Sequence, residues 1–120
     1  MALILVADDE ILLAEMLADL LEDAGYEVLT APHGRVALDI MRTRRPDLLI
    51  TDFMMPLMTG LELAVAVRAE GDMQDLPIIL VTGAQGLLAR QSPGLFNLVV
   101  DKPYDPRALL SQIELLLQRK

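Results

Sequence analysis

Five polar side chains stand at or just after the ends of apolar runs, where a fold can position them for chemistry. They are Asp8, Asp9, Asp52, Thr82 and Lys102. Carboxylates held close together repel one another and raise a carboxyl pKa, and a divalent cation removes that repulsion. Mg²⁺ prefers oxygen ligands and keeps several waters, so one or two carboxylates with a phosphate oxygen suit it. The pattern therefore indicates an acidic Mg²⁺ site.

The same residues favour phosphoryl transfer. Asp52, with an exposed carboxylate oxygen beside the cation, could act as a nucleophile toward phosphorus. The ammonium of Lys102 would pair with a phosphoryl oxygen, and the hydroxyl of Thr82 would donate a hydrogen bond. Transfer of this kind depends on positioning and charge stabilisation.

Each of these residues also has a structural interpretation when it is taken alone. The acidic residues 8–10 favour the N-terminus of a following helix through its dipole, by roughly 0.3–1 kcal/mol each. Thr82 would be an ordinary β-branched strand end, and Lys102 a solvated surface lysine. Only the combination with Asp52 favours a metal pocket.

Short apolar runs that alternate with amphipathic segments predict buried strands and helices. Strands are predicted at 2–7, 27–31, 48–51, 77–82 and 97–100. Helices are predicted at 10–24, around 36–41, at 59–69, at 84–91 and from Pro106 onward. Their ends are marked by Gly25 as a stop, by the capping-box pair Thr59 and Glu62, and by Asp105 before Pro106.

This alternation predicts a parallel sheet covered by helices on both faces. In such a sheet the carboxyl ends of the strands lie at one edge, where ligands bind. If the strands that precede Asp8, Asp52, Thr82 and Lys102 are neighbours, these side chains converge there.

Length and composition limit the class of protein. The 120 residues predict one domain, 1–120, and the 53% hydrophobic content argues against disorder. The absence of cysteine excludes disulfides and thiolate metal sites. No apolar run approaches the roughly 18 residues of a membrane span, and the acidic start is unlike a secretory signal, so we expect a cytoplasmic location without membrane contact. The net charge of −8 argues against direct nucleic-acid binding, which needs a basic face.

The sequence resembles the receiver domain of bacterial response regulators, the CheY-like domain of two-component signalling. Four motifs carry the resemblance: ADDE at 7–10, TDFMMPLMTG at 51–60, VTG at 81–83 and DKP at 101–103. Each motif is short, but their order and spacing over nearly the whole chain are specific. The resemblance implies a doubly wound, flavodoxin-like α/β fold with five parallel strands in the order 2-1-3-4-5.

By motif match, the resemblance makes Asp52 the phosphoacceptor. Asp8 and Asp9 would be the acid pair that binds Mg²⁺ together with Asp52. The backbone carbonyl of Met54 would be a further metal ligand.

The resemblance also implies roles for the other two motifs and for partners. Thr82 would be the switch hydroxyl and Lys102 the phosphate-pairing lysine, with a cis bond before Pro103, although only about 5–6% of X–Pro bonds are cis. A histidine kinase or phosphotransfer protein would supply the phosphoryl group. A downstream protein would bind the face formed by 84–91, 97–100 and the last helix. The protein would be a monomer or a phosphorylation-dependent dimer, and not an enzyme beyond its own phosphoryl transfer and hydrolysis.

The chain departs from the family pattern near its output face. The family usually has Tyr or Phe three residues before the lysine, and this chain has Val99. Valine cannot swing inward as that aromatic does, which leaves Tyr104, beyond the lysine, as one candidate substitute. Ser92-Pro93-Gly94 predicts that the helix at 84–91 is short or irregular.

Other departures concern hydrolysis and the rival functions. Met54 and Ala84 cannot orient a hydrolytic water, so we predict slow loss of the phosphoryl group. Met54 also argues against an aspartyl-phosphatase-type hydrolase, which needs a second aspartate at that position. Dinucleotide binding lacks its glycine-rich turn, because Asp8 and Asp9 stand there and would repel a pyrophosphate. The main alternative is a phosphorylation-independent, receiver-like interaction module, which Val99 favours.

Overall fold

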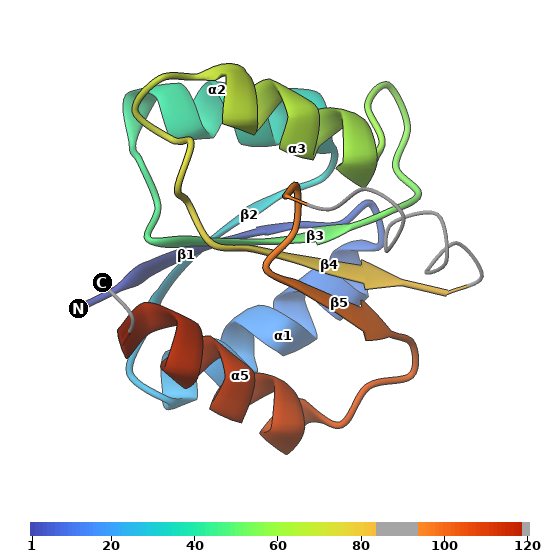
Figure 1. Cartoon of the computed structure of the whole chain (residues 1–120). Helices are drawn as coiled ribbons and strands as arrows, with labels where there is room; N and C mark the ends of the chain where they lie inside the picture. The colour runs from blue at the N-terminus through green and yellow to red at the C-terminus, as the bar shows by residue number, and fades with distance from the viewer. Residues whose placement is uncertain (84–93, 119–120) are drawn as a thin grey trace.

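The computed structural model describes residues 1–83 and 94–118, in which strands and helices alternate along the chain (Figure 1). In chain order the elements are β1 Leu3–Ala7, α1 Ile11–Asp23, β2 Glu27–Ala31, α2 Gly34–Thr43, β3 Leu48–Asp52, α3 Gly60–Ala69, β4 Ile78–Thr82, β5 Leu98–Asp101 and α5 Pro106–Gln118. The predicted elements in this part of the chain are confirmed, with ends that differ by at most two residues. The helix predicted at 84–91, and its predicted irregularity, lie outside the described residues.

The five strands form one parallel sheet in the order β2-β1-β3-β4-β5. The predicted order 2-1-3-4-5 is therefore confirmed. It makes β1, β3, β4 and β5 consecutive neighbours, so the chain segments that follow their carboxyl ends meet at one edge of the sheet.

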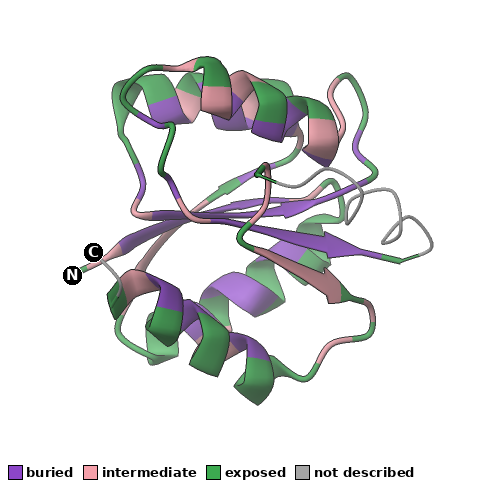
Figure 2. Ribbon diagram, in the orientation of Figure 1, coloured by how far each residue is buried: buried purple, intermediate pink, exposed green. Residues whose placement is uncertain are grey.

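The sheet is covered on both faces, with α2 and α3 on one side and α1 and α5 on the other (Figure 1). Successive side chains of a strand point to opposite faces, and the core divides accordingly. Leu5 and Leu49 pack with α2 and α3, whereas Ile4 and Ile50 pack with α1 and α5. Every residue of β1, β3 and β4 is buried (Figure 2). Burial on both faces explains why residues 3–7, 48–50 and 78–81 form continuous apolar runs instead of alternating ones.

Local sequence determines where the helices begin and end. The capping box predicted for α3 is present: the Thr59 hydroxyl accepts the Glu62 N–H at 3.1 Å, and the Glu62 carboxylate accepts the Thr59 N–H at 2.9 Å. Gly25 follows α1 with φ +100°, a conformation that costs glycine little. The Asp105 carboxylate accepts the Arg107 N–H at 3.0 Å at the start of α5. None of the helices in the described residues is both long and apolar enough to cross a membrane.

Candidate functional site

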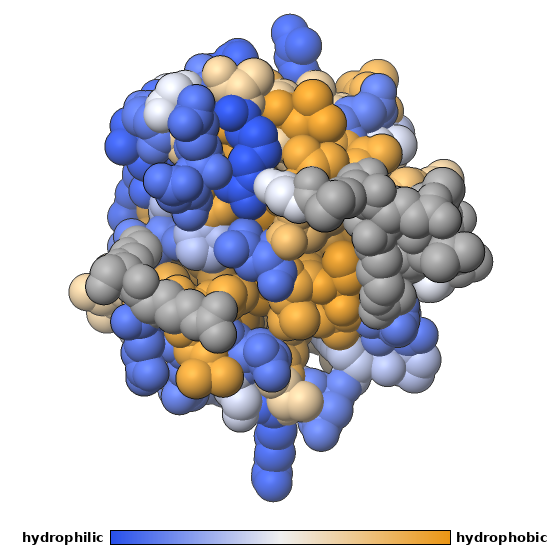
Figure 3. Space-filling view, in the orientation of Figure 1, coloured by the Kyte–Doolittle hydropathy of each residue, from blue (hydrophilic) through white to orange (hydrophobic). Residues whose placement is uncertain are grey.

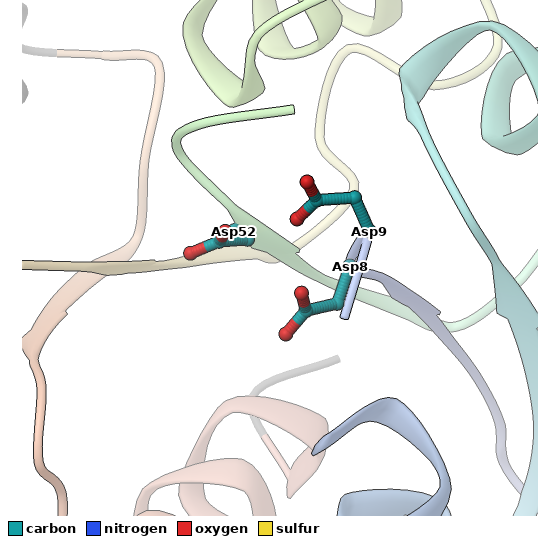
Figure 4. A group of neighbouring side chains, drawn as sticks. All are labelled: Asp8, Asp9 and Asp52. Carbon is teal, nitrogen blue, oxygen red and sulfur yellow. The ribbon is translucent and has the colours of Figure 1, made fainter. Parts of the chain in front are cut away.

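Three carboxylates meet where β1 and β3 end. Asp8 and Asp9 directly follow β1, and Asp52 is the last residue of the neighbouring strand β3. One oxygen of each side chain lies within 4.8 Å of the other two. Figure 4 shows the carboxylates of Asp8 and Asp9 pointing to the same side, beside Asp52. The predicted convergence of these acids is therefore what the fold produces.

Asp8 is the carboxylate whose burial has the clearest electrostatic effect. Its backbone N–H donates to the carbonyl of Ala31 on β2 at 3.0 Å, which continues the sheet by one residue. Burial raises the pKa of Asp8, and the nearby charge of Asp52 raises it further. A hydrogen bond from the Glu10 N–H, 2.9 Å from Asp8 Oδ1, lowers the pKa and compensates only in part. The ionised site is therefore under electrostatic strain in the absence of a cation.

Lys102 directly follows β5 and supplies a positive charge at the same edge of the sheet. Its Nζ lies 2.8 Å from Oδ1 of Asp52, and its backbone N–H donates to the carbonyl of Thr82 at 2.8 Å. Burial disfavours the ammonium form, but the hydrogen bond and charge of Asp52, with the charges of Asp8 and Glu10, outweigh it and raise the pKa of Lys102. The bond from Lys102 to Pro103 is cis, as the resemblance implied.

Thr82 ends β4 with a fully buried side chain. Among residues 1–83 and 94–118, no group forms a hydrogen bond with its hydroxyl oxygen. Thr51, equally buried on β3, instead donates its hydroxyl hydrogen to the Asp52 carbonyl at 3.0 Å. A buried hydroxyl without a partner is costly, which marks Thr82 as a donor available to a ligand.

A cleft of about 370 Å³ brings the predicted site residues together. Its walls include Asp9, Asp52, Met54, Thr82 and Lys102. Met54 is exposed at the rim, where it presents no charged or strongly hydrogen-bonding side-chain group to the cleft. The Asp52 carboxylate, the Lys102 side chain and Thr82 therefore line one space.

A glycine supports this edge in a way that sequence reasoning missed. The Gly60 N–H donates to the Phe53 carbonyl at 2.8 Å, which draws the start of α3 against the end of β3. A Cβ at Gly60 would lie 2.3 Å from the backbone oxygen of Asp52. The signal available in the sequence was the glycine directly after the capping residue Thr59, but it does not reveal how close the approach is.

Val99 and Tyr104 pack on opposite faces of the sheet. Val99 contacts the small cluster of Phe53 and Leu80, on the side of α2 and α3. Tyr104 contacts the cluster that contains Val81, on the side of α1 and α5. In this arrangement Tyr104 does not occupy the space that an aromatic residue in place of Val99 would occupy.

The donor set of Asp8, Asp9 and Asp52 fits a hard divalent cation. All three groups offer carboxylate oxygens, and hard cations such as Mg²⁺ select oxygen ligands over nitrogen and sulfur. Their mutual repulsion and the desolvation of Asp8 are the penalties that a doubly charged ion would offset.

A comparison with protein families identifies the family to which this fold belongs. A family model described as response regulator receiver domain matches residues 4–114. The chain therefore belongs to the receiver domains of two-component response regulators.

Named relatives support the assignment. The phosphate regulon transcriptional regulatory protein PhoB of Pseudomonas aeruginosa is 37% identical over 119 residues, which cover 97% of this chain and 52% of that protein. A chemotaxis protein CheY homolog of Campylobacter jejuni is 38% identical over 117 residues, 92% of this chain and 88% of that one. The crystallised chemotaxis response regulator CheY4 of Vibrio cholerae superimposes with a TM-score of 0.87 at 34% identity, covering 97% and 98% of the two chains. This chain spans about half the length of the first curated relatives it matches.

Proposed function

We propose that this receiver domain accepts a phosphoryl group on Asp52 from a histidine kinase or phosphotransfer protein, and that phosphorylation changes its affinity for a downstream protein. The observation that carries the proposal is the ion pair of Lys102 with Asp52, 2.8 Å long, beside two further carboxylates at the same edge. A structural lysine–aspartate pair would not need those additional negative charges.

The proposed transfer forms one bond and breaks one. A carboxylate oxygen of Asp52 bonds to phosphorus while the phosphorus–nitrogen bond of the donor's phosphohistidine breaks. The departing imidazole nitrogen keeps the electron pair and takes a proton from solvent. Lys102 offsets negative charge on the phosphoryl oxygens, and the Thr82 hydroxyl gains an acceptor that the described residues do not provide.

Asp8, Asp9 and Asp52 would hold Mg²⁺, with the backbone carbonyl of Met54 as a further ligand. When bound, Mg²⁺ neutralises the carboxylates and the charge that develops on the phosphoryl oxygens. The raised pKa of Asp8 supports this assignment, because a nearby dication favours the ionised carboxylate that burial disfavours.

The test is phosphorylation by a small phosphodonor. Incubation with acetyl phosphate and Mg²⁺ should increase the intact mass by one phosphoryl group per chain. The gain should disappear in Asp52→Asn and persist in Asp39→Asn, an exposed aspartate on α2 outside the site. An equal gain in Asp52→Asn would refute the assignment of the phosphoacceptor.

A phosphorylation-independent interaction module is the second candidate, and Val99 favours it. Val99 packs against Phe53 and Leu80 and has no ring that could change position with the state of Thr82. For this candidate, a downstream protein would bind wild type and Asp52→Asn with the same affinity. A wild-type chain that takes up no phosphoryl group from acetyl phosphate with Mg²⁺ would also favour it.

We further propose that the aspartyl phosphate is long-lived. Met54 is exposed at the rim of the cleft, and its thioether is too weak an acceptor to orient an attacking water. The decay of the phosphorylated mass after removal of the phosphodonor measures this lifetime. A lifetime of seconds would contradict the proposal.

A further inference from the structure

A second cavity, of about 420 Å³, shares Asp52 and Lys102 with the cleft described above and is otherwise lined by different residues. Ile50 and Val81 form part of its floor on the sheet, Leu13 and Leu17 line it from α1, and Tyr104 lines it from the connection between β5 and α5. Figure 3 shows apolar side chains gathered at the surface between β5 and α5. The volume falls within the range of about 300–1,000 Å³ that is typical of small-molecule sites.

The charged groups that line this cavity carry a net negative charge. Asp8, Asp52 and Lys102 are its charged lining residues. Because Lys102 already pairs with Asp52 at 2.8 Å, the remaining net charge comes from Asp8. An apolar chamber with one net negative charge is complementary to an apolar molecule that carries a single positive charge.

We propose that this cavity binds a small organic cation, with an aromatic or aliphatic body against Leu13, Leu17 and Tyr104 and an ammonium group at Asp8. The occupant is a small molecule because the cavity has the volume of a small-molecule site, and its walls come from several elements: β1, β3, β4, α1, the β5–α5 connection and the start of α5. Binding at this cavity does not require phosphorylation.

Asp8 gives this cavity a link to the phosphorylation site. The same carboxylate lines the cavity and belongs to the acidic group that fits Mg²⁺. An ammonium at Asp8 and Mg²⁺ at Asp8, Asp9 and Asp52 therefore disfavour each other, and by linkage the effect is reciprocal. This coupling rests on the proposed function, whereas binding of the cation does not.

Three indole compounds with the same apolar ring test the site. Tryptamine carries an ammonium, tryptophol a hydroxyl and indole-3-propionate a carboxylate. The protein contains no tryptophan, so indole fluorescence excited where tyrosine does not absorb reports the probe alone. In EDTA, tryptamine should bind saturably and about tenfold more tightly than tryptophol, the effect of one charged hydrogen bond, and indole-3-propionate should bind most weakly. No saturable tryptamine binding, or equal affinity for all three probes, would overturn the proposal.

Matched substitutions on α1 locate the binding. Leu13 lines the cavity and is 42% exposed, so Leu13→Phe can fill part of the chamber without replacing a core residue. Leu12, 74% exposed, is not a lining residue, and Leu12→Phe is the control. Tryptamine affinity should fall at least tenfold in Leu13→Phe and stay unchanged in Leu12→Phe. Equal affinity in both variants would place the probe elsewhere.

Two aspartate substitutions separate the cavity from the metal site. Asp8→Asn should remove most of the tenfold preference for tryptamine over tryptophol, and a preserved preference would refute the ammonium contact. In wild type, saturating Mg²⁺ should weaken tryptamine and leave tryptophol unchanged. Asp9→Asn should abolish this Mg²⁺ effect and keep tryptamine binding in EDTA, because Asp9 does not line the cavity. Tryptamine binding that Mg²⁺ does not alter would refute the coupling and uphold the binding site.

Discussion

The Thr82 hydroxyl, which has no partner in the described part of the chain, leads to a prediction about stability that is opposite to the usual effect of a core substitution. Valine has the shape of threonine with a methyl group in place of the hydroxyl, so Thr82→Val removes the polar atom and keeps the packing. The Thr82 side chain is fully buried, and its oxygen has no hydrogen-bond partner among residues 1–83 and 94–118. A buried polar group without a partner costs about 1–3 kcal/mol. Thr82→Val should therefore stabilise the ligand-free protein by an amount in that range.

Thr51→Val is the matched control, because the same substitution there removes a hydroxyl that is paired. Thr51 is as buried as Thr82, lies on the adjacent strand β3, and donates to the Asp52 carbonyl at 3.0 Å. Loss of that bond should destabilise the fold by about 0.5–1.5 kcal/mol. For a domain of this size, each kcal/mol shifts the Tm by about 3–5 °C. The two variants should therefore move in opposite directions.

Urea unfolding in EDTA, followed by circular dichroism, measures both changes under ligand-free conditions. If Thr82→Val lowers the free energy of unfolding as much as Thr51→Val does, the Thr82 hydroxyl is paired in solution and the reasoning fails. If the Thr82 hydroxyl is part of the proposed switch, Thr82→Val should still take up a phosphoryl group on Asp52 and should lose the change in partner affinity. A stabilised variant that retained the full change in affinity would show that the hydroxyl is not part of the switch.

Three further predictions follow from the geometry. Gly60→Ala should destabilise the fold by at least about 1–3 kcal/mol in urea unfolding, because the new Cβ would lie 2.3 Å from the Asp52 carbonyl oxygen. Gly71→Ala is the control: the space around its Cβ is open, so it should change stability by less than about 1 kcal/mol. Leu57 has φ 70° and is 82% exposed, so Leu57→Asn should stabilise by about 0.5–1 kcal/mol in the same assay, and no gain would mean that the backbone relaxes. The raised pKa of Lys102 stabilises the fold below its ordinary value of 10.5, and that stabilisation is lost as pH rises through the raised folded value. The difference in urea midpoint between wild type and Lys102→Met should thus shrink above pH 10.5; a difference that does not change with pH would show that the lysine acts through packing.

Much of the fold could be predicted because local sequence and the positions of the elements agree. β1, β3 and β4 are buried on both faces and therefore begin with continuous apolar runs, which are easily recognised. The capping residues Thr59 and Asp105 mark helix starts by direct hydrogen bonds to nearby backbone. The convergence of the acids followed from a general property of parallel sheets, whose strand ends lie at one edge.

Two of the features that the sequence did not reveal depend on distances between segments remote in the chain, and a third is a local backbone conformation. The contact between Gly60 and the Asp52 carbonyl depends on how α3 meets β3. The cavity beside Tyr104 depends on incomplete packing among segments far apart in the chain, which no local pattern encodes. The positive φ of Leu57 is not indicated by its residue type, since leucine rarely adopts that conformation. Each of these features can be recognised only in the three-dimensional structure.

Several features that destabilise this fold lie together at the carboxyl edge of the sheet. Three such features occur at the carboxyl ends of adjacent central strands: the burial of Asp8, the repulsion among three carboxylates, and a Thr82 hydroxyl without a partner among residues 1–83 and 94–118. A sequence shaped only for stability would place apolar residues there, as this chain does at most other positions of β1, β3 and β4. Lys102 offsets one negative charge through Asp52 and leaves the others. A dication and a phosphoryl group together would supply what remains, namely positive charge for Asp8 and Asp9 and an acceptor for Thr82. The same edge would then be least stable when empty and most stable when metal-bound and phosphorylated, which is the energetic asymmetry that a ligand-controlled switch requires.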